Sequence, residues 1–179
     1  TSIATSVPRI THELLLLPDG RVLMIGSFTG GVVDTTTYLY DPVANTWTAS
    51  GALAMTRYNT RSVLLAGGKI LTTTAPIDGG NTSTCELYDI ATGTWSYTGS
   101  SSVLHGRHHV GTLGDGRVVA IAGGTSAMSI YNPATGTWAT GSPLSTSRQD
   151  GIVVKLLNGK FLAAGGYIHL PPQSSHHRN

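Results

Sequence analysis

The sequence carries little charge. Asp, Glu, Lys and Arg make up 11% of its 179 residues, and the formal net charge at pH 7 is +2. Coiled coils and long helical bundles need many Glu, Lys and Leu residues at helical spacing, so this composition excludes them. Such a small net charge also provides no basic footprint for nucleic acid, and we expect no nucleic-acid partner.

Cysteine and long apolar runs are scarce as well. Cys85 is the single cysteine, which excludes an internal disulfide and a cysteine-based zinc site. No run of about 18 apolar residues occurs, so we expect no membrane span. In contrast, the chain has 23 Gly residues and many Ser and Thr residues. Together with 40% hydrophobic residues, this composition favours an all-β, turn-rich domain.

Three Tyr–Trp pairs reveal an internal repeat, which is the first feature to seek in a sequence. In each pair the tyrosine comes seven residues before the tryptophan, and the segments read YDPVANTW, YDIATGTW and YNPATGTW. The pairs are Tyr40 and Trp47, Tyr88 and Trp95, and Tyr131 and Trp138. We expect these six aromatic residues to be structural and to lie in the core.

Two further landmarks recur in the same order. A tight-turn signal ending in Gly20, Gly68, Gly116 or Gly159 precedes an apolar run in each repeat. An arginine precedes each of these turns, at positions Arg9, Arg57, Arg107 and Arg148. Each repeat therefore predicts four short strands, the first before the turn and the second apolar on both faces. The tyrosine lies in the third strand and the tryptophan opens the fourth.

The glycine pairs Gly123-Gly124 and Gly165-Gly166, the Tyr-Asp pairs and the spaced tryptophans resemble the kelch repeat. This resemblance implies a kelch-type β-propeller, in which each repeat forms one four-stranded blade. Repeats one and two depart from the pattern, because Gly26-Ser27 and Thr73-Thr74 stand where the glycine pair belongs. The repeats are similar to those of extracellular kelch proteins related to the galactose oxidase propeller, which implies a secreted or extracellular protein.

The repeats divide the chain unevenly. The propeller is expected over residues 1–170, with blades at 9–56, 57–106, 107–147 and 148–168, and residues 171–179 form a tail. The fourth blade has only its first two strands, so the chain provides about 3.5 to 4 blades. Residues 1–8 are available as a closing strand. Three closures remain open: a four-bladed monomer, a homodimer, and completion by the remainder of a longer chain.

The residues after each landmark arginine differ between repeats, which is where ligand specificity is expected. They begin the innermost strands and would line the rim of the propeller channel. The candidate ligand-binding residues at this channel rim are Tyr58, Asn59, Arg61, His108, Gln149 and Asp150. Arginine favours acidic groups, and Tyr58 offers a surface for stacking. We therefore expect a non-catalytic binding or scaffold module for a protein segment or glycan, and a structural role for Arg57, Arg107 and Arg148.

Two alternatives remain: the scaffold of an oxidase related to galactose oxidase, and a structural element completed by self-association. The resemblance would place copper on tyrosines, histidines and a Cys–Tyr crosslink, but the sequence contains no Tyr-His pair. His108 and His109 are adjacent on a strand and must point to opposite faces. We therefore expect no catalytic residue, metal or cofactor. Asn81 begins the tripeptide Asn-Thr-Ser, a candidate glycosylation site.

Overall fold

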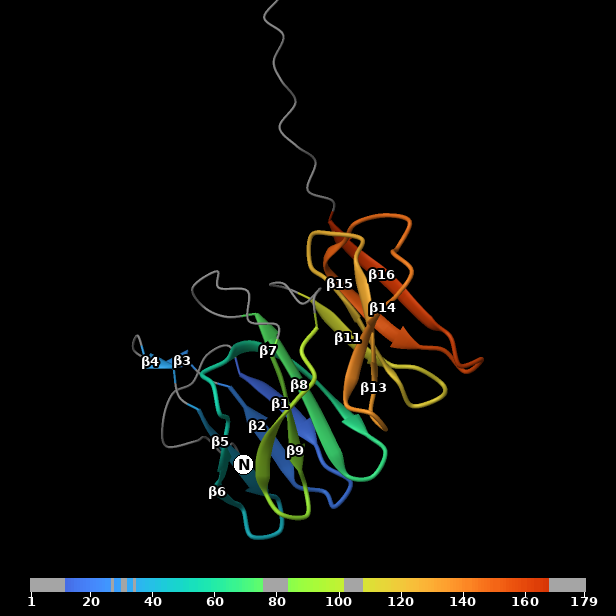
Figure 1. Ribbon diagram of the computed structural model, residues 1–179. Coiled ribbons are helices and arrows are strands. Elements are labelled where there is room, and N and C mark those ends of the chain that lie inside the picture. The colour runs from blue at the N-terminus through green and yellow to red at the C-terminus, as the bar shows by residue number, and fades with distance from the viewer. Residues whose placement is uncertain are drawn as a thin grey trace, which may run out of the picture.

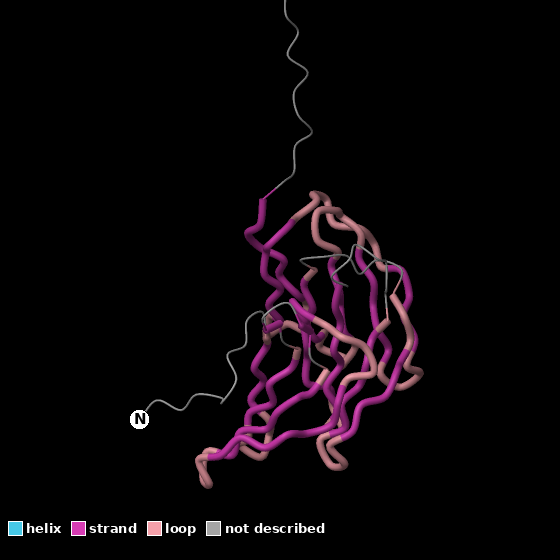
Figure 2. Tube along the Cα trace, turned by 90° about the vertical axis from the view of Figure 1, so that its left-hand side faces the viewer, coloured by secondary structure: helices cyan, strands magenta, loops and turns pink. Residues whose placement is uncertain are grey.

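The protein is built from antiparallel β-sheets, as a computed structural model shows (Figure 1). The structure describes residues 12–26, 28–29, 32–33, 35–75, 84–101 and 108–167. Within these ranges there is no helix, and in particular none long and apolar enough to span a membrane. Strands account for most of the described trace, and the loops lie mainly at the ends of the sheets (Figure 2).

Three sheets have four strands each, in sequential order. The first sheet comprises β1 (Glu13–Leu16), β2 (Val22–Ile25), β5 (Thr36–Asp41) and β6 (Thr46–Ala52). The second comprises β7 (Tyr58–Leu65), β8 (Lys69–Ala75), β9 (Cys85–Asp89) and β10 (Thr94–Thr98). The third comprises β11 (His109–Thr112), β12 (Val118–Ile121), β13 (Met128–Asn132) and β14 (Thr137–Thr140).

The remaining described strands form two-stranded sheets. The fourth sheet pairs β15 (Gln149–Lys155) with β16 (Phe161–Tyr167), and a short hairpin pairs β3 (Phe28–Thr29) with β4 (Val32–Val33). The sequence-based prediction of an all-β class with four strands per repeat is thus confirmed for three repeats. The fourth repeat has its first two strands, as expected.

The sequence predicts that the second strand of a repeat ends at its glycine pair, and this prediction is wrong for the fourth repeat. The glycine pair at 123–124 follows β12 as expected, but Gly165 and Gly166 lie inside β16. Both have positive φ angles, of 69° and 78°, yet pairing continues through Gly151 with Gly165 and Gln149 with Tyr167. The partner strand β15 is long enough to extend the ladder past the glycines, which glycine's conformational freedom permits.

The first strands of the four sheets lie side by side. Strand β7 contacts β1 on one side and β11 on the other, and β11 contacts β15. Each intervening space is filled by an apolar cluster. One contains Leu23 and Ile70, the next Leu71 and Val118, and the last Val119, against which Phe161 packs. The four sheets therefore form one consecutive stack, in which each sheet packs on its chain neighbours.

The same hydrogen bonds recur where the outer strands of one sheet meet those of the next sheet. We call each interface between two consecutive sheets a joint. The Tyr88 hydroxyl lies 2.6 Å from Ser50 Oγ of the first sheet, and the Tyr131 hydroxyl lies 2.6 Å from Thr98 Oγ1 of the second. A backbone N–H also donates across each joint, from Gly51 to the Gly93 carbonyl and from Gly99 to the Gly136 carbonyl. At Gly51 and Gly99 a Cβ atom would overlap that carbonyl, so close approach requires glycine.

Candidate functional site

The predicted rim lies where β7, β11 and β15 begin. These three strands are adjacent, and the repeat gives them the same direction, so their first residues meet at one end of the stack. Tyr58 and Asn59 open β7, and Gln149 and Asp150 open β15. The side chains of these four residues are outside the described part of the structure. Their ligand-binding role therefore stays a prediction.

Arg61 is the predicted rim residue whose side chain is described and partly exposed. It lies in β7, and its Nη1 donates to the Thr60 carbonyl at 3.0 Å. Within the described part of the chain, its guanidinium forms no ion pair with a carboxylate, although its charge acts on Glu13 from a distance. Arg61 therefore retains a cationic group at the rim.

His108 occupies a different setting, because it is buried between the second and third sheets. Its Nε2 lies 2.6 Å from Thr73 Oγ1, and the same hydroxyl donates to the Arg61 carbonyl at 2.9 Å. A threonine hydroxyl has one proton to donate, so the His108 Nε2–H must be the donor to Thr73. With 1% of its surface exposed, His108 ties two sheets together in this structure and presents no surface to a ligand.

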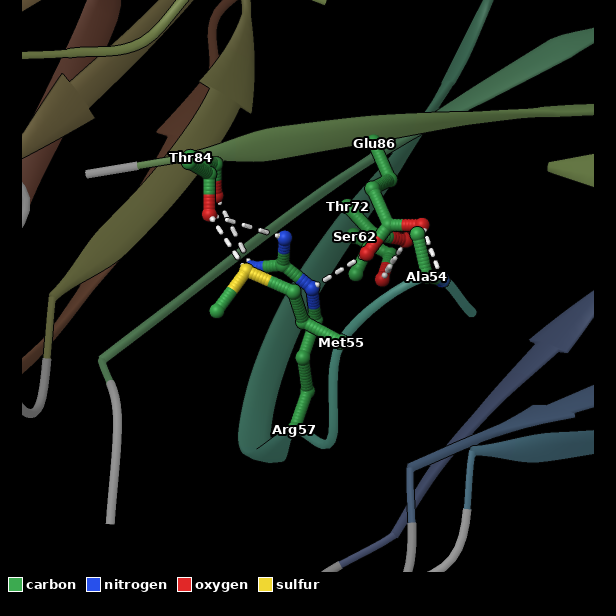
Figure 3. Close-up of polar contacts among 7 residues, drawn as sticks. All are labelled: Ala54, Met55, Arg57, Ser62, Thr72, Thr84 and Glu86. Carbon is green, nitrogen blue, oxygen red and sulfur yellow. Dashed lines mark hydrogen bonds and ion pairs between the residues drawn. The ribbon is translucent and has the colours of Figure 1, made fainter. Parts of the chain in front are cut away.

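Arg57 forms a buried ion pair with Glu86 (Figure 3). Its Nε donates to Glu86 Oε1 at 2.8 Å, and its other nitrogens donate to the Thr84 carbonyl and hydroxyl. The second carboxylate oxygen of Glu86 accepts the Ala54 N–H at 2.8 Å. The ion pair thus attaches the segment that connects the first sheet to the second, which contains Ala54 and Arg57, to strand β9. Both side chains are 1% exposed or less, so neither is open to a ligand, and the structural role of Arg57 stays a prediction.

The other landmark arginines and the glycosylation candidate can be placed only in part. Arg148 forms a β-bridge with Thr125, and its Nη1 donates to the Gly165 carbonyl at 2.6 Å. These contacts join the third sheet to the fourth. Arg107 and Asn81 lie outside the described residues, so their predicted roles stay predictions.

Sequence reasoning missed two carboxylates inside the stack, the fully buried Glu86 and the partly buried Glu13. Glu86 comes two residues before Tyr88, where the other repeats have Tyr38 and Ser129, so the repeat itself gave no signal. The only available signal was a glutamate within an apolar strand of a protein that has few charges. Such a carboxylate needs a partner when it is buried. Glu13 of β1 is partly buried, and it accepts bonds from the Ser62 N–H at 3.0 Å and the Ser62 hydroxyl at 2.6 Å.

Burial raises the pKa of Glu13 above its usual value of 4.5, although the bonds from Ser62 and the charge of Arg61 act in the opposite direction. The folded state therefore binds this proton more tightly than the unfolded state. The stability that results is present below the unfolded pKa and is lost as the pH rises through the raised folded pKa.

The variant Glu13→Gln removes this titration and keeps an acceptor and a donor for Ser62. As the pH rises from about 4 to 7, the free energy of unfolding of wild type, measured in urea, should fall relative to that of Glu13→Gln. Asp115→Asn is the control, because the bonds from Arg117 hold the pKa of this exposed carboxyl below its usual value of 3.8. Asp115 therefore titrates below this pH range, and the stability of Asp115→Asn should vary with pH as that of wild type does. Superimposable pH profiles of wild type and Glu13→Gln would contradict the assignment.

Cys85 is buried between the second and third sheets, and Trp138 packs against the same cluster. Burial raises the pKa of its thiol to about 12, so the thiol stays protonated at neutral pH. A buried, protonated thiol is a poor nucleophile and a poor metal ligand.

Within the described ranges, no three His, Cys, Asp or Glu side chains lie close enough together to hold a metal ion. No protein-family model matches the chain, and no curated protein matches it significantly.

Proposed function

We propose that the chain is a kelch-type β-propeller segment that serves as a non-catalytic binding module. Its ligand is a protein segment or glycan carrying acidic groups, and the site is the rim where β7, β11 and β15 begin. The observation that carries this proposal is the adjacency of these strands, which brings residues from separate repeats to one end of the stack. A site assembled from several rigid strands suits recognition of an extended ligand.

The contrast between two arginines favours an acidic ligand. Arg61 pairs with no carboxylate among the described residues, whereas Arg57 is fully engaged by Glu86 and Thr84. The cationic group near the rim therefore remains available for carboxylate or sulfate, which arginine binds through directed, charge-assisted hydrogen bonds.

The kelch assignment is supported by the repeated Tyr–Trp pairs, which face each other across the third and fourth strands of three sheets.

The test uses arrays of acidic peptides and of sulfated, sialylated and neutral glycans. For a ligand found in this way, Arg61→Ala should weaken binding roughly 10- to 100-fold, the usual effect of losing a hydrogen bond to a charged group. The matched control is Arg117→Ala, which removes the same charge near the hairpin turn at the other end of the third sheet.

Arg117→Ala should leave the affinity nearly unchanged at moderate salt. Equal losses in the two variants would indicate a nonspecific charge effect. Unchanged binding by a folded Arg61→Ala variant would move the site away from the rim.

A further inference from the structure

Exposed apolar side chains gather on the outer face of the first sheet. In β1, Glu13 bonds to Ser62, and Leu15 packs into the cluster shared with the second sheet. Because side chains alternate along a strand, Leu14 and Leu16 point the opposite way, away from the second sheet. They are 54% and 71% exposed, which is unusual for leucines in a strand that lies against a core.

The fourth sheet has a similar apolar face at the other end of the stack. Val153 and Phe161 pack against the third sheet. The alternating residues Ile152, Val154 and Leu162 therefore face away from it, and they are 62%, 46% and 50% exposed. On each side, then, the stack ends in a face with exposed apolar side chains that no other described sheet covers, although Met24, which pairs with Leu14 across the first sheet, is itself buried.

Among the described residues, the outer strands of the first sheet lack a hydrogen bond that the equivalent strands of the second and third sheets make. Tyr88 and Tyr131 bond to hydroxyls of the sheet before them, whereas the Tyr40 hydroxyl donates to Asn45 in its own turn, at 2.9 Å. The indole N–H of Trp95 donates to Thr37 of the preceding sheet. The indole N–H of Trp47 makes no such bond within the described part of the chain, but neither does that of Trp138, so the indoles do not distinguish the first sheet. What distinguishes it is the tyrosine hydroxyl, which bonds to the preceding sheet twice within the described stack but not at Tyr40.

The repeat shows which residues would meet at such a joint. Counted back from the hairpin turn, Leu14 matches Ser62, Val110 and Val153. Each of these packs on the preceding sheet: Ser62 binds Glu13, Val110 joins the cluster that contains Leu65, and Val153 lies over Gly111. In the fourth sheet, the positions matching Glu13 and Leu15 are Ile152 and Val154. By register, then, Leu14 and Leu16 are the natural partners of Ile152 and Val154.

We propose that the outer face of the first sheet binds the outer face of the fourth sheet in a second copy of this chain. Two observations select a second copy as the occupant. Both faces are apolar in a charge-poor protein, and their residues occupy matching positions of the repeat. The described β15 makes no contact with β1 comparable to its contact with β11, so within the described residues the fourth sheet of a copy does not lie against the first sheet of the same copy.

Two such joints related by a twofold axis close a pair of chains. Four sheets from each copy give about eight in the ring, within the range of closed propellers. This inference does not depend on the ligand proposed above, because the outer faces are separate from the rim.

Light scattering after size exclusion tests the proposal over a roughly hundredfold range of concentration. Wild type should show twice the chain mass of 18.6 kDa and dissociate on dilution. Leu16→Asp and Leu162→Asp each place a charge in every joint and should weaken association about a hundredfold or more. Leu157→Asp is the matched control, because Leu157 is exposed in the β15–β16 turn and lies off the proposed face.

A mixture of Leu16→Asp and Leu162→Asp, the two variants of the proposed faces, provides the sharper test. The first sheet of Leu162→Asp and the fourth sheet of Leu16→Asp are both intact, so a mixture can form one normal joint per pair. We expect the mixture to associate when neither variant does alone. A monomeric mass of wild type at every concentration would overturn the proposal. Association that survives both face variants, or that Leu157→Asp disrupts equally, would overturn it as well.

Discussion

Replacing Glu86 by Ala should lower the free energy of unfolding by about 3–5 kcal/mol, the usual cost of removing one partner of a buried ion pair. The substitution would leave the Arg57 guanidinium buried with only Thr84 as a partner, and it would also leave the Ala54 N–H without its acceptor. Urea unfolding followed by tryptophan fluorescence measures this loss.

Two controls separate the charge from the packing. Glu86→Gln keeps the side-chain shape and an acceptor for Ala54, so its loss should be smaller than that of Glu86→Ala. The double variant Arg57→Met, Glu86→Leu removes both charges and should recover part of the loss, since apolar pairs often replace buried ion pairs. Recovery should be incomplete, because the Thr84 carbonyl also loses a donor. A loss below about 1 kcal/mol for Glu86→Ala would show that the pair is not buried as described.

Trp95→Ala should lower the free energy of unfolding by about 3 kcal/mol, the lower end of the range for buried tryptophan or phenylalanine, because Trp95 is partly buried. The Trp95 ring lies 5.0 Å from that of Tyr88, its N–H donates to Thr37 at 3.3 Å, and it packs on the cluster between the first two sheets. Its removal would open a cavity in that joint. Denaturant unfolding with a far-UV circular dichroism signal measures the loss without relying on the deleted fluorophore.

The matched control is Trp47→Ala, at the same position of the first repeat. Trp47 lies 5.1 Å from Tyr40, an equivalent ring pair, but no preceding sheet of the described chain packs against it. Trp47→Ala should therefore cost clearly less than Trp95→Ala. Equal losses in the two variants would contradict the view that these tryptophans act mainly across the joints.

The strands could be predicted because their signals are local. A spacing of seven residues around a tight turn places Tyr88 opposite Trp95, and the structure has this pairing in three sheets. The extent of β16 could not be predicted in the same way. Whether a glycine pair ends a strand depends on how far the partner strand continues, and β15 continues past Gly165.

The site was harder to predict because its contacts are distant in sequence. Arg57 was expected to be structural, but its partner Glu86 comes 29 residues later, at a position where no other repeat has a carboxylate. The sequence placed His108 and His109 on opposite faces but gave no reason for His108 to bond Thr73, 35 residues earlier. A residue that varies between repeats can either stabilise the interface between two sheets or bind a ligand. Only the neighbours that pack against it distinguish these two roles.

The joints between consecutive sheets also bear on how the chain folds. Every joint within one chain connects a sheet with its immediate neighbour in the sequence, so order can spread from one repeat to the next, as in other repeat proteins. The second and third sheets each have a neighbour on both sides and four strands of their own, which makes either one a suitable nucleus. Among the described residues, the fourth sheet has two strands and one neighbouring sheet, so it should be the last to form and the first to open during native-state fluctuations.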